Sequence, residues 1–140
     1  MVVDDEPAIR ALVTKIVERA GYPVVSARDG AEAIEKLEGD EYAVVVLDLM
    51  MPNVDGYGLI EYIKSSSRRR PAIIVISAGD TAALRRLDGA VVHSILRKPF
   101  DIDVLGDLIA AAALSMEEEA LESVRRAGEL LPFRKSDAVC

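Results

Sequence analysis

Two uninterrupted apolar runs, at residues 44–47 and 72–76, constrain the fold more than any other feature of this sequence. A strand with one face in water alternates apolar and polar residues, whereas a strand covered on both faces is apolar throughout. Segments with the apolar spacing of an amphipathic helix separate the apolar runs, so that the chain repeats strand then helix five times. This alternation predicts an α/β domain with a parallel sheet, right-handed crossovers and helices on both faces.

Helix and turn signals place the individual elements. Pro7 suits the first turn of a helix, Asp29-Gly30 suits the turn into the second helix, Asp101 suits a helix N-cap, and Gly21 suits a helix end. Strands are predicted at residues 1–3, 24–27, 44–48, 72–77 and 91–97. Helices are predicted at residues 7–20, 30–38, 56–64, 79–87 and 102–114.

The length of 140 residues fits one domain of residues 1–114 followed by an extension of residues 115–140. Ser115 and Glu118 have the spacing of a capping box, which predicts a separate or continued helix to about Arg126. Its apolar residues include Met116, Leu121 and Val124. This stripe can fold back on the domain, pair with a second chain, or belong to a linker, and residues 131–140 show no periodicity.

Charge and composition exclude several classes of function. The net charge of −7 disfavours direct binding to nucleic acid or to an anionic membrane. The single cysteine, Cys140, permits no intramolecular disulfide and no multi-thiolate metal site. No apolar run approaches the roughly 20 residues that cross a bilayer, and acids stand where a signal peptide carries positive charge. We therefore expect a cytoplasmic protein without a membrane segment.

Polar side chains end or directly follow four of the predicted strands. Asp4 and Asp5 follow the first strand, Asp48 ends the third, Ser77 ends the fourth, and Lys98 follows the fifth. Alone, Asp48 is also explained as a strand-capping residue that starts a turn. Because ligands of open α/β sheets bind at the carboxyl ends of the strands, we expect the five side chains to meet at one edge.

Three carboxylates at one edge repel each other and favour a hard cation. Two charges about 4 Å apart repel by about 4 kcal/mol at an effective dielectric constant near 20. Mg²⁺ binds a few oxygen ligands and keeps several waters, which leaves room for phosphoryl oxygens. Asp48 could then attack a phosphorus atom and form an aspartyl phosphate, while Lys98 and Ser77 hold the remaining oxygens.

The order and spacing of these motifs resemble the receiver domain of the two-component response regulator family over Met1 to Leu114. The matching motifs are Val3-Asp4-Asp5-Glu6, Leu47-Asp48-Leu49-Met50-Met51-Pro52 with Asp55-Gly56, Ser77-Ala78 and Lys98-Pro99-Phe100. The resemblance implies a flavodoxin-like, doubly wound (βα)5 fold with a five-stranded parallel sheet of order 2-1-3-4-5. A C-terminal helical extension follows it here.

The resemblance also implies roles for the polar side chains. Asp48 would accept a phosphoryl group from a phosphohistidine on a sensor histidine kinase or a histidine phosphotransfer protein. Ser77 would move toward that group, and Lys98 would pair with it. The chain would be a phosphoacceptor switch and not an enzyme, beyond Mg²⁺-dependent self-phosphorylation from small donors and self-dephosphorylation.

The family also implies a ligand set for Mg²⁺. Asp5 and Asp48 would bind the ion directly, Asp4 would act largely through water, and the backbone carbonyl of Met50 would supply another ligand. These assignments carry over position by position from the matching motifs.

Three departures from the family pattern affect these expectations. Only three residues precede Asp4, so that the central strand is short or the chain has been cut. Ile95 stands where the family usually has an aromatic residue whose burial follows the hydroxyl movement. Arg97 is larger and more charged than the small residue expected before Lys98.

Other residues have simpler explanations than a functional role. His93 is the single histidine and lies on a predicted strand without a cluster of ligands around it. Gly56 and Gly58 suit a turn and a helix start, because no G-x-G-x-x-G follows a strand. The run Arg68-Arg69-Arg70 suits a solvated loop.

The leading hypothesis is a stand-alone receiver that switches its binding to a downstream output protein. The alternative is a phosphorylation-independent receiver-like interaction module, which the Ile95 departure favours. An aspartate-based phosphatase or mutase is disfavoured, because Asp4 and Asp5 are adjacent and do not form Asp-x-Asp. A homodimer could form through the fourth and fifth helices or through the C-terminal extension.

Overall fold

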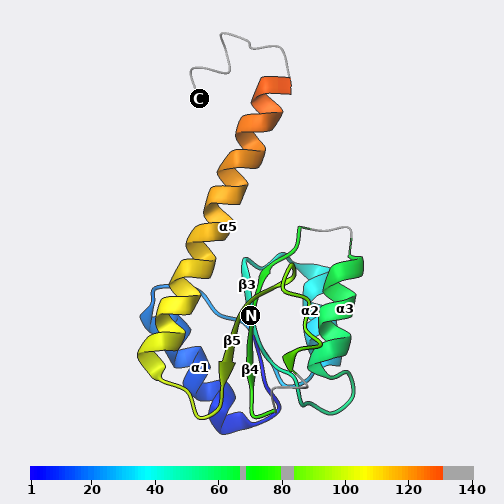
Figure 1. The fold of residues 1–140 in the computed structure, drawn as a ribbon, viewed down its shortest axis with the longest axis vertical. Helices are drawn as coiled ribbons and strands as arrows, with labels where there is room; N and C mark the ends of the chain where they lie inside the picture. Colours follow the sequence, from blue (N-terminus) through cyan, green and yellow to red (C-terminus); the bar gives the residue numbers. More distant parts are fainter. Residues whose placement is uncertain (67–68, 80–83, 131–140) are drawn as a thin grey trace.

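Five parallel strands form one sheet in the order β2-β1-β3-β4-β5, which confirms the predicted topology. The computed structural model describes residues 1–66, 69–79 and 84–130 (Figure 1). The strands are β1 Val2–Val3, β2 Ser26–Ala27, β3 Val44–Asp48, β4 Ala72–Ser77 and β5 Val92–Arg97. The helices are α1 Pro7–Arg19, α2 Gly30–Gly39, α3 Gly56–Ser65 and α5 Ile102–Leu130. Residues 80–83 of the helix expected at residues 79–87 lie outside the described residues.

Helices cover both faces of the sheet, as the apolar runs require. Figure 1 shows α1 and α5 on one side of the strands and α2 and α3 on the other. Successive residues of a strand point to opposite faces. Val45 therefore packs in the cluster that includes α2 and α3, and Val46 packs in the cluster that includes α1 and α5. Ile73 and Ile74 of β4 divide in the same way.

Aspartate side chains cap the starts of α2 and α3. Asp29 caps α2 by accepting a hydrogen bond from the Glu32 N–H, with 2.8 Å between the two atoms. Asp55 caps α3 by accepting a hydrogen bond from the Gly58 N–H at 2.9 Å. These caps satisfy backbone donors that the first helical turn leaves unpaired.

The second strand is shorter than predicted. It spans Ser26–Ala27, whereas the sequence predicted residues 24–27. Its neighbour β1 has two residues, which pair with Ser26 and Ala27, and the hydrogen bonding continues back only to the Val25 carbonyl, which accepts from the Val2 N–H at 2.9 Å. Val25, which was expected in this strand, is 39% exposed.

The C-terminal helix is longer than predicted. It runs without a break from Ile102 through Leu130, so the continued helix is confirmed and the alternative of a separate helix starting at Ser115 is wrong. Ser115 lies within the helix because its neighbour Met116 is buried against the domain, and no Gly or Pro interrupts the segment around it. The Nη2 atom of Arg69 also donates a hydrogen bond to the Met116 carbonyl at 2.7 Å.

The first strand lies in the middle of the sheet although it is short. Pairing continues back to Met1, whose carbonyl accepts a hydrogen bond from the Val46 N–H at 2.9 Å. The Met1 ammonium donates to the Val44 carbonyl at 2.7 Å. Burial lowers the pKa of this amino group from 8.0 to about 5. A hollow of about 220 Å³ lies beside it, with Val17, Tyr22 and other residues in its wall.

The Met1 amine predicts a pH dependence of stability. Between pH values of about 5 and 8, the unfolded chain holds a proton that the folded chain has released. The free energy of unfolding should therefore rise with pH across this window, by at most about 1.4 kcal/mol per pH unit. Urea unfolding at several pH values measures this slope.

Acetylation of Met1 provides the control. It replaces the amine with an amide N–H that can still donate to the Val44 carbonyl. The acetylated chain should lose this part of the pH dependence. Equal slopes for the free and acetylated chains would contradict the explanation.

Candidate functional site

The carboxyl edge of the sheet gathers the polar side chains expected there, with one exception. Val3 pairs with Leu47, so Asp4 and Asp48 end neighbouring strands. On the other side of β3, Asp48 pairs with Ile76, directly before Ser77. Lys98 follows β5 and donates its backbone N–H to the Ser77 carbonyl at 3.0 Å. Asp4, Asp48 and Ser77 are all buried.

The ammonium of Lys98 lies among three carboxylates. Its Nζ atom is 3.1 Å from Oδ2 of Asp48, 3.5 Å from Oδ2 of Asp4 and 3.7 Å from Oε1 of Glu6. Desolvation lowers the pKa of Lys98, but the hydrogen bond to Asp48 and the charges of the three acids outweigh it and raise the pKa above its usual value. Lys98 is therefore held in its charged form.

Asp4 is the acid that burial affects most clearly. Desolvation raises the pKa of Asp4, although the Glu6 N–H donates to Asp4 Oδ1 at 2.9 Å and Lys98 also favours the charged form. An acid in this position gains from any additional positive charge, because one ammonium faces three carboxylates.

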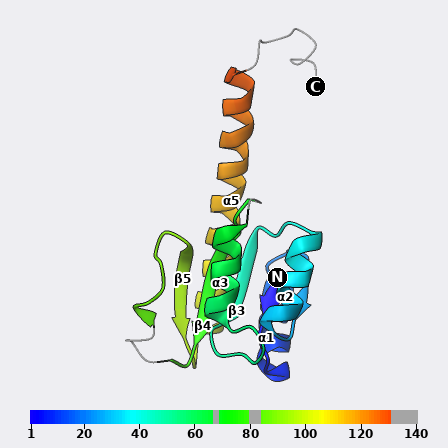
Figure 2. The same ribbon diagram turned by 90° about the vertical axis from the view of Figure 1, so that its right-hand side faces the viewer.

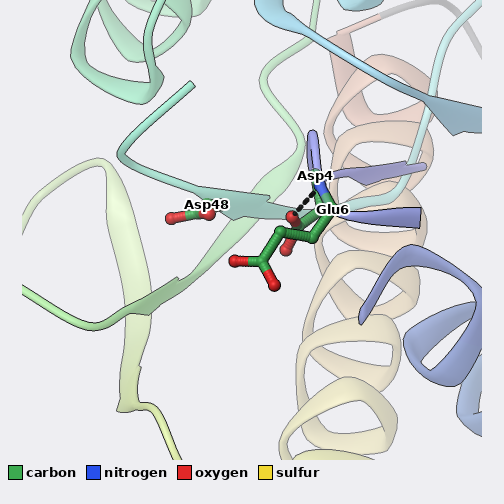
Figure 3. Close-up of side chains that lie close together, drawn as sticks. All are labelled: Asp4, Glu6 and Asp48. Atoms are coloured by element: carbon green, nitrogen blue, oxygen red, sulfur yellow. Dashed lines mark hydrogen bonds between the residues drawn. The ribbon is translucent and has the colours of Figure 1, made fainter. Parts of the chain in front are cut away.

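The carboxylates that converge are Asp4, Glu6 and Asp48, shown in Figure 3. One oxygen atom from each lies within 4.8 Å of the others. Asp5 is exposed and is not one of the three residues in this group. Hard oxygen donors at this separation suit a divalent cation, which would relieve the excess negative charge.

Glu6 is the site residue that sequence reasoning missed. Its backbone N–H donates a hydrogen bond to Asp4 Oδ1. The chain therefore turns back toward the sheet edge before α1 starts at Pro7. The sequence signal was present, since an acid two residues after Asp4 precedes a helix-starting proline. Its side chain is 60% exposed, so it reaches the cluster from the solvent side.

The hydroxyl of Ser77 takes part in the turn after β4. Its Oγ atom accepts a hydrogen bond from the Gly79 N–H at 3.0 Å. On the adjacent strand, Asp48 Oδ1 accepts a hydrogen bond from the Met50 N–H at 3.2 Å. The loop after Asp48 thus folds back on the carboxylate, and it brings the Met50 backbone close to the acid cluster.

Gly56 packs closely against the backbone of Asp48 and Leu49. Its N–H donates to the Leu49 carbonyl at 2.8 Å. A Cβ atom at Gly56 would lie 2.5 Å from the Leu49 Cα and 2.7 Å from the Asp48 carbonyl oxygen. Gly56 and Gly58 thus serve the turn and the start of α3, as the sequence indicated.

The residues that the sequence analysis set aside or noted as departures are not among the three acids of the cluster. His93 is exposed, and its Nδ1 atom lies 2.7 Å from Ser94 Oγ. Ile95 is 42% exposed on β5, and Arg97 is also exposed. The side chain of Arg70 donates to the Lys64 carbonyl at 3.0 Å, while Arg68 lies outside the described residues.

Comparison with known proteins agrees with this arrangement. The family model for the response regulator receiver domain matches residues 1–110. The transcriptional regulatory protein TcrA of Mycobacterium tuberculosis is 32% identical over 106 residues, which are 75% of this chain and 42% of TcrA. The chain therefore spans less than half the length of that relative.

Solved structures show the same fold. A receiver domain protein from Methanospirillum hungatei is 32% identical and superposes with a TM-score of 0.66, over 84% of this chain and 92% of that one. The response regulator TrrA of Thermotoga maritima, solved in complex with Mg²⁺-BeF, is 29% identical with a TM-score of 0.70, over 79% and 95% of the two chains.

The doubly wound parallel sheet with buried acids at its carboxyl edge defines an α/β domain of the flavodoxin-like class. With the family model matching most of its length, the chain belongs to the response regulator receiver domain family. Within the part of the chain that the structure describes, no helix is both long and apolar enough to cross a membrane.

Substitution of Gly56 tests how closely α3 supports the Asp48 loop. Gly56→Ala should lower the free energy of unfolding by about 1–3 kcal/mol, because backbone atoms must move to admit the methyl group. Gly39→Ala is the matched control at the end of α2, where a Cβ atom meets nothing within 4 Å. It should be neutral or stabilise by up to about 1 kcal/mol.

Urea unfolding of both variants compares the two sites. Equal free energies of unfolding for Gly56→Ala and Gly39→Ala would show that the close packing at Gly56 is not required.

Proposed function

We propose that this chain is a phosphorylation switch whose acceptor is Asp48. The observation that supports it most is the buried Asp48 carboxylate, at the carboxyl edge of the sheet, with Lys98 Nζ 3.1 Å from its Oδ2 atom. An ammonium at that distance can pair with a carboxylate and, after transfer, with a phosphoryl oxygen. Family membership supplies the reaction class, and the residues present suit it.

The transfer is a substitution at phosphorus. An oxygen of Asp48 attacks the phosphorus atom of a phosphohistidine, the P–N bond breaks, and the histidine nitrogen keeps the electron pair of that bond. The product is an acyl phosphate on Asp48 and a histidine that takes up a proton from water. The chain acts as acceptor and switch and not as a turnover enzyme, apart from self-phosphorylation from small donors and self-dephosphorylation.

We propose Mg²⁺ as the cation of this site. Asp5 and Asp48 would bind it directly, together with the backbone carbonyl of Met50, and Asp4 would act through water. When bound, Mg²⁺ neutralises charge as the phosphoryl group approaches. The cluster of Asp4, Glu6 and Asp48 oxygens supports a cation at this edge, because these acids outnumber the single ammonium among them, whereas the place of Asp5 in the ligand set rests on the family alone.

A response to the phosphoryl group can pass through the fourth and fifth strands. Lys98 and Ser77 are joined through the hydrogen bond between their backbones. If Ser77 Oγ turns toward the new phosphoryl oxygens, it gives up the hydrogen bond from Gly79. The change would then reach β5, where Ile95 is 42% exposed.

The phosphoryl donor needs a docking surface next to Asp48. An apolar hollow of about 390 Å³, formed by Ile9 and Leu12 of α1 with Lys98, Pro99 and Phe100, provides one. It suits the apolar face of a helix that carries the phosphohistidine, as in a sensor histidine kinase or histidine phosphotransfer protein. We place this exchange in the cytoplasm, where a chain with a single cysteine stays reduced.

The alternative function is a receiver-like module that binds its output partner without phosphorylation. It is favoured by Ile95, since the family's usual aromatic switch residue is absent. Phosphoryl uptake distinguishes the two functions.

Replacement of Asp48 tests the proposed acceptor. Asp48→Asn should abolish the gain of one phosphoryl mass after incubation with Mg²⁺ and a small phosphodonor, because an amide is not a competent nucleophile there. Intact-mass measurement follows the uptake. Asp107→Asn on the exposed face of α5 is the control and should take up phosphate like the parent chain.

Uptake by the Asp48→Asn variant would refute Asp48 as the acceptor. A folded parent chain that gains no mass from any donor would instead favour the phosphorylation-independent module.

Two further variants test which acid binds the cation. Asp5→Asn should weaken Mg²⁺ binding by roughly tenfold or more, and Glu6→Gln should weaken it less. Fixing the longer Glu6 side chain costs more rotamer freedom, up to about 2 kcal/mol. Calorimetric titration with Mg²⁺ measures both affinities. A larger loss in Glu6→Gln than in Asp5→Asn would assign the direct ligand to Glu6.

A further inference from the structure

The second half of α5 leaves the domain and presents its side chains to solvent. Met116 is its last buried residue in the described part of the chain, and residues 117–127 are exposed or, at Ala120, half-buried. Figures 1 and 2 both show this part of the helix standing away from the sheet and from the other helices. A helical segment of this length is marginal in water without packing, so it needs a partner surface.

An apolar stripe runs along this projecting segment. Leu114, Leu121 and Val124 are 57%, 64% and 71% exposed. Their spacing of seven and then three residues places them on one side of the helix. The buried residues Leu105 and Met116 lie on the opposite side, so the stripe is turned away from the domain that carries it.

The described charged side chains of the projecting segment are acidic near the domain and basic further out. Glu117, Glu118 and Glu119 lie near the domain, Arg125 and Arg126 lie about two turns further on, and Glu122 between them lies 3.9 Å from Arg126 of the same helix. A parallel pair of such helices would place acids beside acids and arginines beside arginines. An antiparallel pair would place the acids of each helix beside the arginines of the other, which is favourable in both halves.

We propose that a second copy of this chain covers the stripe, with the two α5 helices antiparallel. Leu121 of each copy packs against Val124 of the other, and Glu118 of each copy faces Arg125 of the other. Both contacts can form in one register. Along an antiparallel pair, the number of a residue rises as the number of the facing residue falls, so their sum stays nearly constant, and the two contacts meet this condition. Leu114 of each copy then lies near the carboxyl end of the other helix.

The net charge of the protein also favours the antiparallel arrangement. Each chain carries a charge of −7, so two domains held side by side repel each other. In the antiparallel pair, the domains lie at opposite ends of the paired segments. About 14 residues of helix separate them by about 20 Å, beyond the Debye length of about 8 Å at physiological salt.

This pairing does not depend on phosphorylation of Asp48. It uses residues of α5 that are far along the chain from the acid cluster, so its failure would leave the proposed function untouched.

Charge reversal at the paired positions is the main test. Glu118→Arg and Arg125→Glu are exposed changes that should leave the monomer fold intact, which circular dichroism checks. Each single variant should weaken the dimer by roughly tenfold or more, because two attractive contacts become two repulsive ones. The double variant Glu118→Arg with Arg125→Glu restores opposite charges and should recover the dimer.

Sedimentation equilibrium over a range of protein concentrations measures the association. A parent chain that stays monomeric throughout would overturn the proposal. Single variants that dimerise like the parent chain, or a double variant that is as weak as the singles, would overturn it as well.

Crosslinking tests the helix direction separately. In a Cys140→Ser background, chains with Glu118→Cys and chains with Arg125→Cys are mixed under oxidising conditions. Antiparallel helices should give the mixed disulfide, with little disulfide between two Glu118→Cys chains. Predominant disulfides between identical variants would show parallel helices and overturn the proposal.

Discussion

The contact between Lys98 and the buried carboxylates is the interaction on which the arrangement of the site depends. Asp4 and Asp48 are each nearly enclosed by the protein, and a buried charge is costly unless a partner of opposite sign is close. Lys98 supplies that partner from the end of β5, on the far side of β4 from β3. One side chain thus joins strands that have no direct pairing with each other.

This contact also bears on the proposed phosphorylation switch. The acids exceed the single ammonium in number, so the cluster gains from an added cation. A phosphoryl group on Asp48 would add negative charge beside Lys98 and beside the Ser77 hydroxyl, both of which belong to the edge formed by β4 and β5. Any rearrangement of these two residues acts on the same pair of strands.

The carboxyl and amino edges of the sheet carry different chemical groups. The carboxyl edge carries the charged cluster, while the opposite edge holds the Met1 amine, the Val44 carbonyl and an adjacent hollow. The central strand β1 links them, although it has two residues. From the same side of the sheet as α1, α5 carries its exposed stripe away from both edges, so that contacts made there leave the carboxyl edge accessible.

Much of the fold could be predicted from the sequence, because apolar runs and helical spacing report burial directly. The continuous apolar runs at β3 and β4 required cover on both faces, and the turn at Asp29-Gly30 marked the start of α2. Since all strands run in one direction, the polar residues that end them had to share one edge. The meeting of Asp4, Asp48, Ser77 and Lys98 followed from that direction alone.

Tertiary structure decided the features that depend on distances between segments. Asp5 and Glu6 are adjacent acids, and their residue types alone do not indicate which of them reaches Lys98. In the structure, the turn at Glu6 brings its carboxylate to Lys98 and leaves Asp5 exposed. The length of β2 depends on how many residues β1 offers for pairing, and the continuity of α5 through Ser115 depends on the burial of Met116. Local patterns carry no record of such contacts, because each is made with a residue distant in the chain.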